Sequence, residues 1–189
     1  MKKIFLLASF VVAMSLNLFA QNDTVYFIDF QESMGSWSID DKVKPESVSF
    51  IWSQTAQYGM KATAYVGGVN NETESWLVSA PLDLTSNTTL SLDFKHARKY
   101  ADNSYLSVQI TKDGTNWTKL EFANWPDGSS WDFIDAGEVD ITSYISATTQ
   151  IAFVYTSTSS AAATWEVDNV LVKGNGTRIV EPEKPVEHI

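Results

Sequence analysis

The sequence predicts an all-β fold in which two antiparallel sheets form a sandwich. Apolar and polar residues alternate along several short segments, most clearly at 90–96 and 105–111. An alternation with a period of two is typical of a strand that buries one face and exposes the other. Turn residues separate these segments, and no stretch has the spacing and caps of a long helix. Roughly ten short strands in a sandwich therefore follow.

The individual strands are short and end at loops or turns. The strand at 75–79 stops before Pro81, because proline cannot donate a hydrogen bond to a ladder. The polar turn at 112–116 returns the chain as a hairpin. In chain order, the predicted strands are 25–30, 48–52, 61–66, 75–79, 90–96, 105–111, 117–122, 139–141, 150–156 and 164–172. The predicted loops include 33–41, 124–131 and 157–163.

The beginning of the chain predicts export. Lys2 and Lys3 precede a nearly uninterrupted apolar run at 4–19, which reaches the small residue Ala20. These are the three parts of a secretory signal peptide, 1–20, with cleavage after Ala20. A retained membrane helix is the alternative, but the run is shorter than the ~20 residues that span a bilayer. We expect a secreted, periplasmic or cell-surface protein whose mature chain does not insert into the membrane.

The mature chain is expected to form one domain. Residues 21–173 suffice for a sizeable core, whereas glycine, proline and alternating charge at 174–189 predict a flexible tail or linker. The formal net charge is −10 and no basic patch occurs, so the surface repels phosphate and nucleic acid is not an expected partner. The chain has no cysteine, which excludes disulfides and a lipid-modified cysteine.

Two carboxylates interrupt the last predicted strand. Side chains alternate across a strand, so Glu166 and Asp168 share one face with Val170 and Val172, while Trp165 belongs to the other face. Both faces therefore carry apolar residues. Burying an unpaired carboxylate costs several kcal/mol unless a cation or several donors meet it. The strand thus indicates a metal site or a dense polar network.

Six segments of the chain carry a recognisable pattern: 27–30, 58–65, 74–84, 90–94, 151–157 and 164–169. Together they resemble the choice-of-anchor J domain, a group of bacterial secreted jelly-roll domains similar to the cleaved adhesin domains of gingipains. The block Trp-Leu-Val-Ser-Ala-Pro-Leu-Asp-Leu and the Asp-Asn-Val ending form the most specific pair. The resemblance covers nearly the whole mature chain, 25–173. It implies a jelly-roll β-sandwich that is secreted or surface-exposed and serves adhesion or binding.

The resemblance also implies a structural calcium site, because related adhesin domains bind calcium. In a jelly roll the first and last strands tend to be neighbours, which would bring Asp29 and Glu32 near Glu166 and Asp168. Carboxylates gathered in one region repel one another unless a hard cation neutralises them, and oxygen ligands suit Ca²⁺. We expect calcium ligands from Asp29, Glu32, Glu74 and Asp168. The alternative is that Asp168 accepts backbone N–H bonds in a turn and the others are solvated.

Aromatic residues in loops form the second candidate site. Trp125 and Trp131 flank a Pro-Asp-Gly-Ser-Ser loop, and Trp37, Trp52 and Tyr58 lie in or beside other loops. Flat rings beside short polar groups suit a sugar-binding surface, because a sugar has an apolar face and a rim of hydroxyls. We expect ligand contacts from Trp125, Trp131, Trp37 and Tyr58. The alternative is that these rings fill the core.

Catalysis is not expected. Laminarinase-type hydrolases use a jelly roll and the pattern Glu-x-Asp-x-x-Glu; Glu166 and Asp168 match its first two places, but residue 171 is leucine. The general acid of a glycoside hydrolase would then be missing. His96 shares a strand face with Leu92 and Phe94, which favours a core position over a catalytic base. No nucleophile elbow, zinc spacing or phosphate loop occurs.

These observations favour a non-catalytic binding or adhesion module whose partner is an extracellular glycan or protein. A structural spacer or assembly subunit of a surface complex is the alternative. The two functions differ in their expectation for the loops. A binding module should expose an aromatic patch, whereas a spacer should bury its tryptophans.

Overall fold

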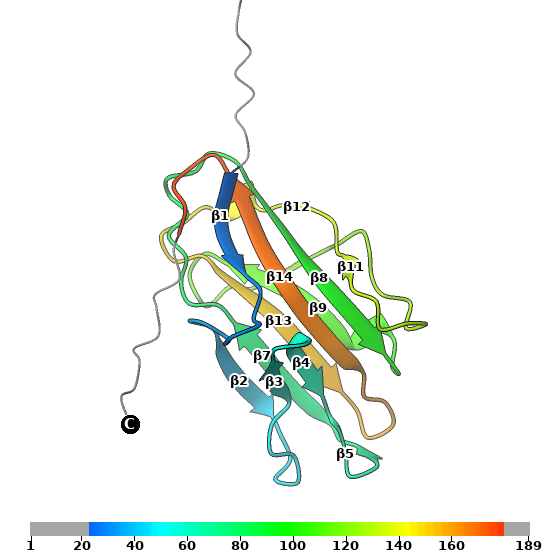
Figure 1. Ribbon diagram of the computed structural model, residues 1–189. Helices are drawn as coiled ribbons and strands as arrows, with labels where there is room; N and C mark the ends of the chain where they lie inside the picture. Colours follow the sequence, from blue (N-terminus) through cyan, green and yellow to red (C-terminus); the bar gives the residue numbers. More distant parts are fainter. Residues whose placement is uncertain (1–22, 180–189) are drawn as a thin grey trace, which may run out of the picture.

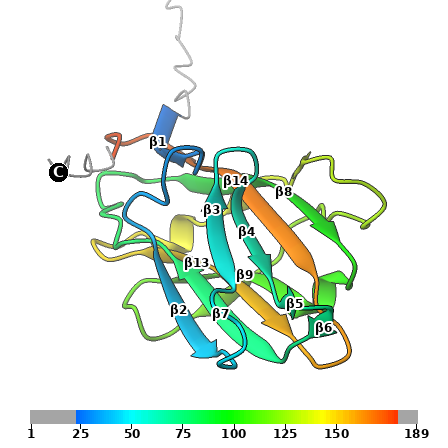
Figure 2. The same cartoon turned by 60° about the horizontal axis from the view of Figure 1, so that its bottom comes forward.

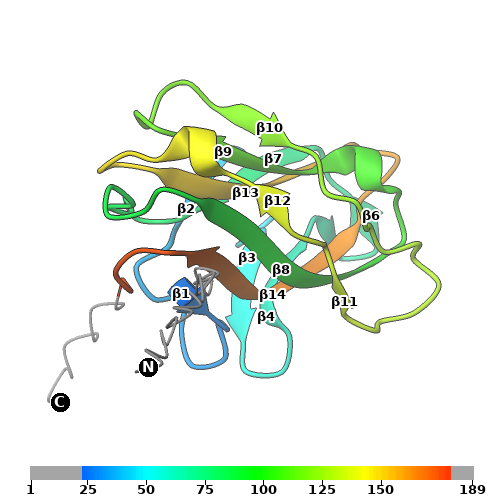
Figure 3. The ribbon, with the colours of Figure 1, turned by 90° about the horizontal axis from the view of Figure 1, so that it is seen from above.

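The computed structural model describes residues 23–179, and the predicted signal peptide at 1–20 lies outside them. Within this range the chain forms a β-sandwich of the jelly-roll type, with two stacked antiparallel sheets (Figure 3). Sheet A contains β1 (Asp23–Ile28), β3 (Trp52–Thr55), β4 (Gly59–Thr63), β8 (Leu90–Lys99), β11 (Ile134–Asp135), β12 (Val139–Asp140) and β14 (Thr164–Gly174). Sheet B contains β2 (Ser38–Val43), β7 (Thr73–Val78), β9 (Leu106–Thr111), β10 (Thr118–Leu120) and β13 (Gln150–Ser157).

The remaining elements are short and lie at the ends of the sandwich. A hairpin of β5 (Tyr65–Val66) and β6 (Val69–Asn70) follows β4, as Figure 2 shows. Single 3₁₀ turns occur at η1 (Asn103–Tyr105) and η2 (Thr142–Tyr144). Among the residues that the structure describes, no helix is long and apolar enough to cross a membrane.

Strand β14 is the centre of sheet A (Figure 1). It pairs with β8 along most of its length, with β4 through its first half and with β1 through its second half. The expectation that the first and last strands are neighbours is thus confirmed, since Ile28 pairs with Val170. The ladder between β14 and β8 shifts register between Asp168 and Leu171, where Asn169 has a φ of 50°. This irregularity is a β-bulge, which bends the strand locally.

The core between the sheets is largely aromatic. Phe94 of β8 and Trp165 of β14 face sheet B, where their rings meet Phe153 of β13 at centroid distances of 4.9 and 5.7 Å. Such edge contacts add about 0.5–1.5 kcal/mol each beyond the burial of apolar area. Because alternate residues of β8 point inward, Ser91, Asp93 and Lys95 lie on the outer face of sheet A.

Two segments differ from the sequence-based expectation. The predicted loop at 33–41 contains most of β2, an edge strand whose residues are all exposed; without a buried face it has no apolar alternation. Beyond β14, Asn175 accepts a hydrogen bond from Thr88 N at 2.9 Å, and Ile179 N donates to Val25 O at 2.6 Å. Hydrogen bonds to the domain thus reach Ile179, and the rest of the predicted tail, 180–189, lies outside the described residues.

Candidate functional site

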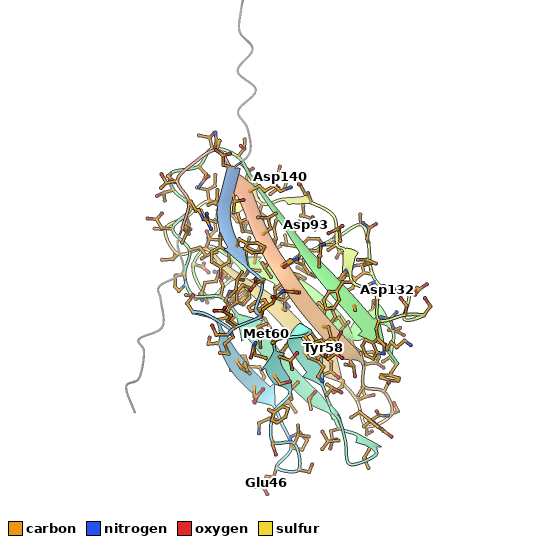
Figure 4. The ribbon with its side chains drawn as sticks, viewed as in Figure 1. Glu46, Tyr58, Met60, Asp93, Asp132 and Asp140 are labelled. Carbon is orange, nitrogen blue, oxygen red and sulfur yellow. The ribbon has the colours of Figure 1, made fainter. Side chains whose placement is uncertain are left out.

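The turn between β3 and β4 packs closely against β14. Gly59 has a φ of 63°, and a Cβ atom there would lie 2.5 Å from Val167 O and 3.2 Å from the Asp168 Cβ. Only glycine tolerates both the positive φ and this approach. The turn holds Tyr58 in front of the outer face of sheet A (Figure 4), where Lys61 Nζ lies 5.7 Å from the centre of its ring.

Glu166 is the most buried carboxylate of this outer face. Its strand neighbours are Lys61 of β4 and Ala97 of β8, and its side chain is only 4% exposed. The Oε2 atom has no hydrogen-bond partner among the described residues. Burial raises the pKa of Glu166 to about 7, although the positive charge of Lys61 opposes this shift. The predicted carboxylate within an apolar part of this strand is therefore present at Glu166.

Asp168 lies two residues further along β14, near Asp29. Burial raises the pKa of the Asp168 carboxyl, and the nearby negative charge of Asp29 raises it further. The Asn169 N–H, which donates to Asp168 Oδ1 at 2.7 Å, and the charge of Lys95 act in the opposite direction. The bond from Asn169 fits the predicted alternative, in which Asp168 accepts a backbone N–H.

The four predicted calcium ligands are not brought together. Glu74 lies on β7 of sheet B, where alternate residues point away from the core, and it accepts a hydrogen bond from Trp76 Nε1 at 2.8 Å. It is therefore on the opposite side of the sandwich from Asp168. Glu32 is exposed in the loop after β1. Within residues 23–179 no group of three or more His, Cys, Asp or Glu side chains could hold a metal ion. The structure thus does not gather the four predicted ligands at one place, and among these four only the charges of Asp29 and Asp168 interact.

The predicted aromatic residues separate into core and surface. Trp37 is 2% exposed, donates from Nε1 to the Tyr26 hydroxyl at 2.7 Å and stacks on Phe153 at 5.7 Å. Its assignment to a ligand-binding surface is therefore wrong, because its ring belongs to the core. Trp125 is half-buried, with its ring 6.0 Å from that of Trp165. Trp131 alone of the predicted tryptophans is clearly at the surface, 40% exposed.

Trp131 forms an exposed pair with Tyr100, which we call the aromatic pair. The ring centroids lie 6.0 Å apart at an interplanar angle of 72°, and Tyr100 is 78% exposed. Lys99 Nζ lies 5.7 Å from the Trp131 ring. Tyr100 has a φ of 80°, a costly conformation for a bulky residue that is concentrated at functional sites. The sequence analysis missed Tyr100, although an aromatic residue directly after Arg98 and Lys99 at a strand end could have indicated exposure.

Arg98 connects the two loops that carry the aromatic pair. Its side chain is buried, and its guanidinium donates to the Ala101 carbonyl, next to Tyr100, and to the Pro126 carbonyl. Burial lowers the pKa of Arg98, while Asp102 and Asp127 act to raise it. One cation thus fixes backbone atoms from both loops, because a guanidinium offers five donors in a rigid fork.

His96 is buried beside the loop that carries Trp131. It is fully buried, and burial lowers its pKa to about 4, so the ring is neutral at pH 7. Nδ1 accepts from Trp165 Nε1 at 3.4 Å, which leaves Nε2 to donate to the Asn124 carbonyl at 3.2 Å. The predicted core position is confirmed.

Solved structures with the same fold include adhesin and carbohydrate-binding modules. The K3 cleaved adhesin domain of Lys-gingipain from Porphyromonas gingivalis w83 is 17% identical, with a TM-score of 0.52 over 81% of this chain and 99% of that chain. The xylan-binding module CBM15 is 10% identical, with a TM-score of 0.50 over 83% of this chain and 99% of that one. At these identities the likeness shows the fold. No protein-family model matches the chain, and no curated protein does either.

Proposed function

We propose that the protein is an exported, non-catalytic binding module of the choice-of-anchor J type that recognises an extracellular glycan. The observation that carries this proposal is the exposed aromatic pair, Tyr100 and Trp131. The buried Arg98 donates hydrogen bonds to the backbones of both loops that carry the pair. Two rings set at 72° offer one face for stacking and one edge beside it. Aromatic rings with adjacent polar groups are the usual contacts of a sugar ring.

The support beneath the aromatic pair favours binding over a purely structural role. A surface that is ordered before it meets its ligand does not lose that conformational entropy on binding. Holding Tyr100 at a positive φ costs of the order of 1–3 kcal/mol, which other contacts must offset. Hydrogen-bonding groups for hydroxyls come from Asp102, Asp127 and Asp132 in these two loops and from Lys99 at the end of β8. The shared fold of an adhesin domain and a xylan-binding module also supports the proposal.

Affinity electrophoresis of the mature protein in gels containing xylan, mannan or galactan tests the proposal. We expect at least one polysaccharide to retard the wild-type protein, and Trp131→Ala and Tyr100→Ala each to weaken that retardation strongly. Phe50→Ala is the matched control, because Phe50 is 60% exposed but precedes β3 at the far edge of sheet A. Wild-type mobility unchanged by every glycan, or retardation of both variants equal to that of the wild type, would overturn the proposal.

Calcium enters this proposal only at Asp29 and Asp168. One hard cation between these side chains would neutralise the negative charge with which Asp29 raises the pKa of Asp168, and its other ligands would be carbonyl oxygens and water. Export is proposed with cleavage after Ala20; an intact mass of the released protein beginning at Gln21 would support it.

A second candidate function, an assembly subunit of a surface complex, is favoured by a different observation. Apolar side chains are exposed where β3 begins and on the β5–β6 hairpin, namely Phe50, Tyr65, Val66 and Val69. Exposed apolar residues that gather at one end of a domain are typical of protein contacts. If this function is correct, Phe50→Ala impairs co-purification with a cell-surface complex, whereas Trp131→Ala does not.

A further inference from the structure

The β-bulge in β14 creates a pocket on the outer face of sheet A. The register shift between Asp168 and Leu171 interrupts the ladder to β8, and Asn169 at its centre adopts a φ of 50°. Beside it lies a pocket of about 140 Å³ lined by Phe27, Asp93, Lys95, Asp135, Asn169 and Leu171. These residues come from β1, β8, β11 and β14, and Figure 4 shows Asp93 on this face. The pocket is separate from the aromatic pair.

One wall of the pocket is apolar. Phe27 of β1 pairs with Leu171 of β14, so both side chains lie on the same outer face. Phe27 lies on β1, which pairs with β14 alone among the described strands, and it is 41% exposed. An exposed ring next to a leucine leaves an apolar surface on which a flat ligand face can stack.

The opposite side of the pocket is polar and incompletely hydrogen-bonded. Asp93 Oδ1 accepts from Phe94 N at 2.8 Å and from Gly137 N at 3.0 Å, which fixes the carboxylate. The other Asp93 oxygen and the side-chain amide of Asn169 make no hydrogen bond with the described residues. Lys95 Nζ and Asp135 Oδ1 are 4.0 Å apart, a separation too long for a hydrogen bond. Donors and acceptors are thus available together.

We propose that this pocket binds one neutral sugar ring, an inference that rests on the proposed function and assigns it a second contact site. A cation would meet Lys95, and an anion would meet Asp93 and Asp135. A neutral hydroxyl group both donates and accepts, so it can satisfy lysine, carboxylate and amide alike. At about 140 Å³ the pocket is smaller than the roughly 300–1,000 Å³ that encloses a drug-sized ligand, which fits a single ring.

Nuclear magnetic resonance titration of the mature protein with methyl glycosides of glucose, galactose, mannose and xylose tests this assignment. We expect one glycoside to shift the amide signals of Phe94, Gly137 and Asn169 in a saturable manner. Asn169→Gly removes the amide but keeps the backbone, because glycine favours a positive φ. We expect it to weaken binding about three- to tenfold, the effect of one or two lost hydrogen bonds. Phe27→Ala should weaken binding at least as much.

Controls separate this inference from the proposed function. Trp131→Ala should leave the methyl glycoside affinity unchanged, whereas Asn169→Gly should leave residual retardation by the polysaccharide at the aromatic pair. If no glycoside shifts these amides, or if Asn169→Gly binds as tightly as the wild type, the assignment is wrong even where polysaccharide binding persists. Shifts caused instead by the guanidinium of N-acetylarginine amide would also overturn it, because the site would then select a cation.

Discussion

The guanidinium of Arg98 donates twice to one oxygen atom, the carbonyl of Pro126, from Nε at 3.2 Å and from Nη2 at 2.6 Å. Its Nη1 donates to the Ala101 carbonyl in the neighbouring loop. Gly128 also approaches this group, since a Cβ there would lie 3.2 Å from both Nη atoms. A single buried side chain thus determines how the loops that carry Tyr100 and Trp131 face each other.

Replacing Arg98 with lysine should therefore disturb both stability and binding. Lysine keeps the charge but cannot reach both carbonyls with a planar fork. We expect Arg98→Lys to lower the free energy of unfolding by about 2–3 kcal/mol, because a hydrogen bond to a charged group contributes that order. Urea denaturation measures the change. Lys119→Ala, which breaks an exposed ion pair with Glu121, is the control and should cost less than about 1 kcal/mol. Equal effects of the two substitutions would contradict the role of Arg98.

Two glycines with nearly the same backbone conformation allow a matched test of the turn beside β14. Gly59 and Gly67 have φ values of 63° and 62°, but only Gly59 has atoms where a Cβ would be. Gly67→Ala should cost about 1–2 kcal/mol, the strain of a positive φ. Gly59→Ala should cost about 1–3 kcal/mol more, because the methyl group overlaps Val167 O. Similar melting temperatures for both variants would refute the close approach.

The raised pKa of Glu166 should make stability fall as pH rises. Between its unfolded pKa of 4.5 and its folded pKa of about 7, the native state keeps a proton that the unfolded state has lost. The native state binds more protons in this window, so the slope of the unfolding free energy against pH is negative. Glu166→Gln should remove this contribution, up to roughly 3 kcal/mol between pH 5 and pH 8. Urea denaturation at both pH values measures it; parallel curves for wild type and variant would contradict the shift.

Calcium should stabilise the protein if it bridges Asp29 and Asp168. A ligand that binds only the native state adds about 1–2 kcal/mol at a concentration of about ten times its dissociation constant. We expect calcium to raise the melting temperature of the wild-type protein and chelation to reverse the rise, with no response in Asp29→Asn. A wild-type melting temperature that ignores both calcium and chelator would exclude the ion from this site.

The local pattern predicted the strands better than it predicted which side chains meet. The alternation of apolar and polar residues was sufficient to predict β8 and β9, because each of these strands buries one face. By contrast, Glu74 and Asp168 belong to different sheets, and sheet membership depends on pairing with segments far apart in the chain. The burial of Trp37 depends on the Tyr26 hydroxyl, and the position of Tyr100 depends on Arg98 reaching Pro126. Sequence spacing contains none of these long-range contacts.

The place of β14 in the chain has a consequence for how the protein is made. It is the last strand within residues 23–179, yet it lies between β8 and β4 and also pairs with β1. During synthesis on a ribosome, sheet A therefore lacks its central strand until Gly174 has been added. Until then the two sheets cannot enclose a complete core, so the domain at 23–179 is expected to fold only after its last strand has been synthesised.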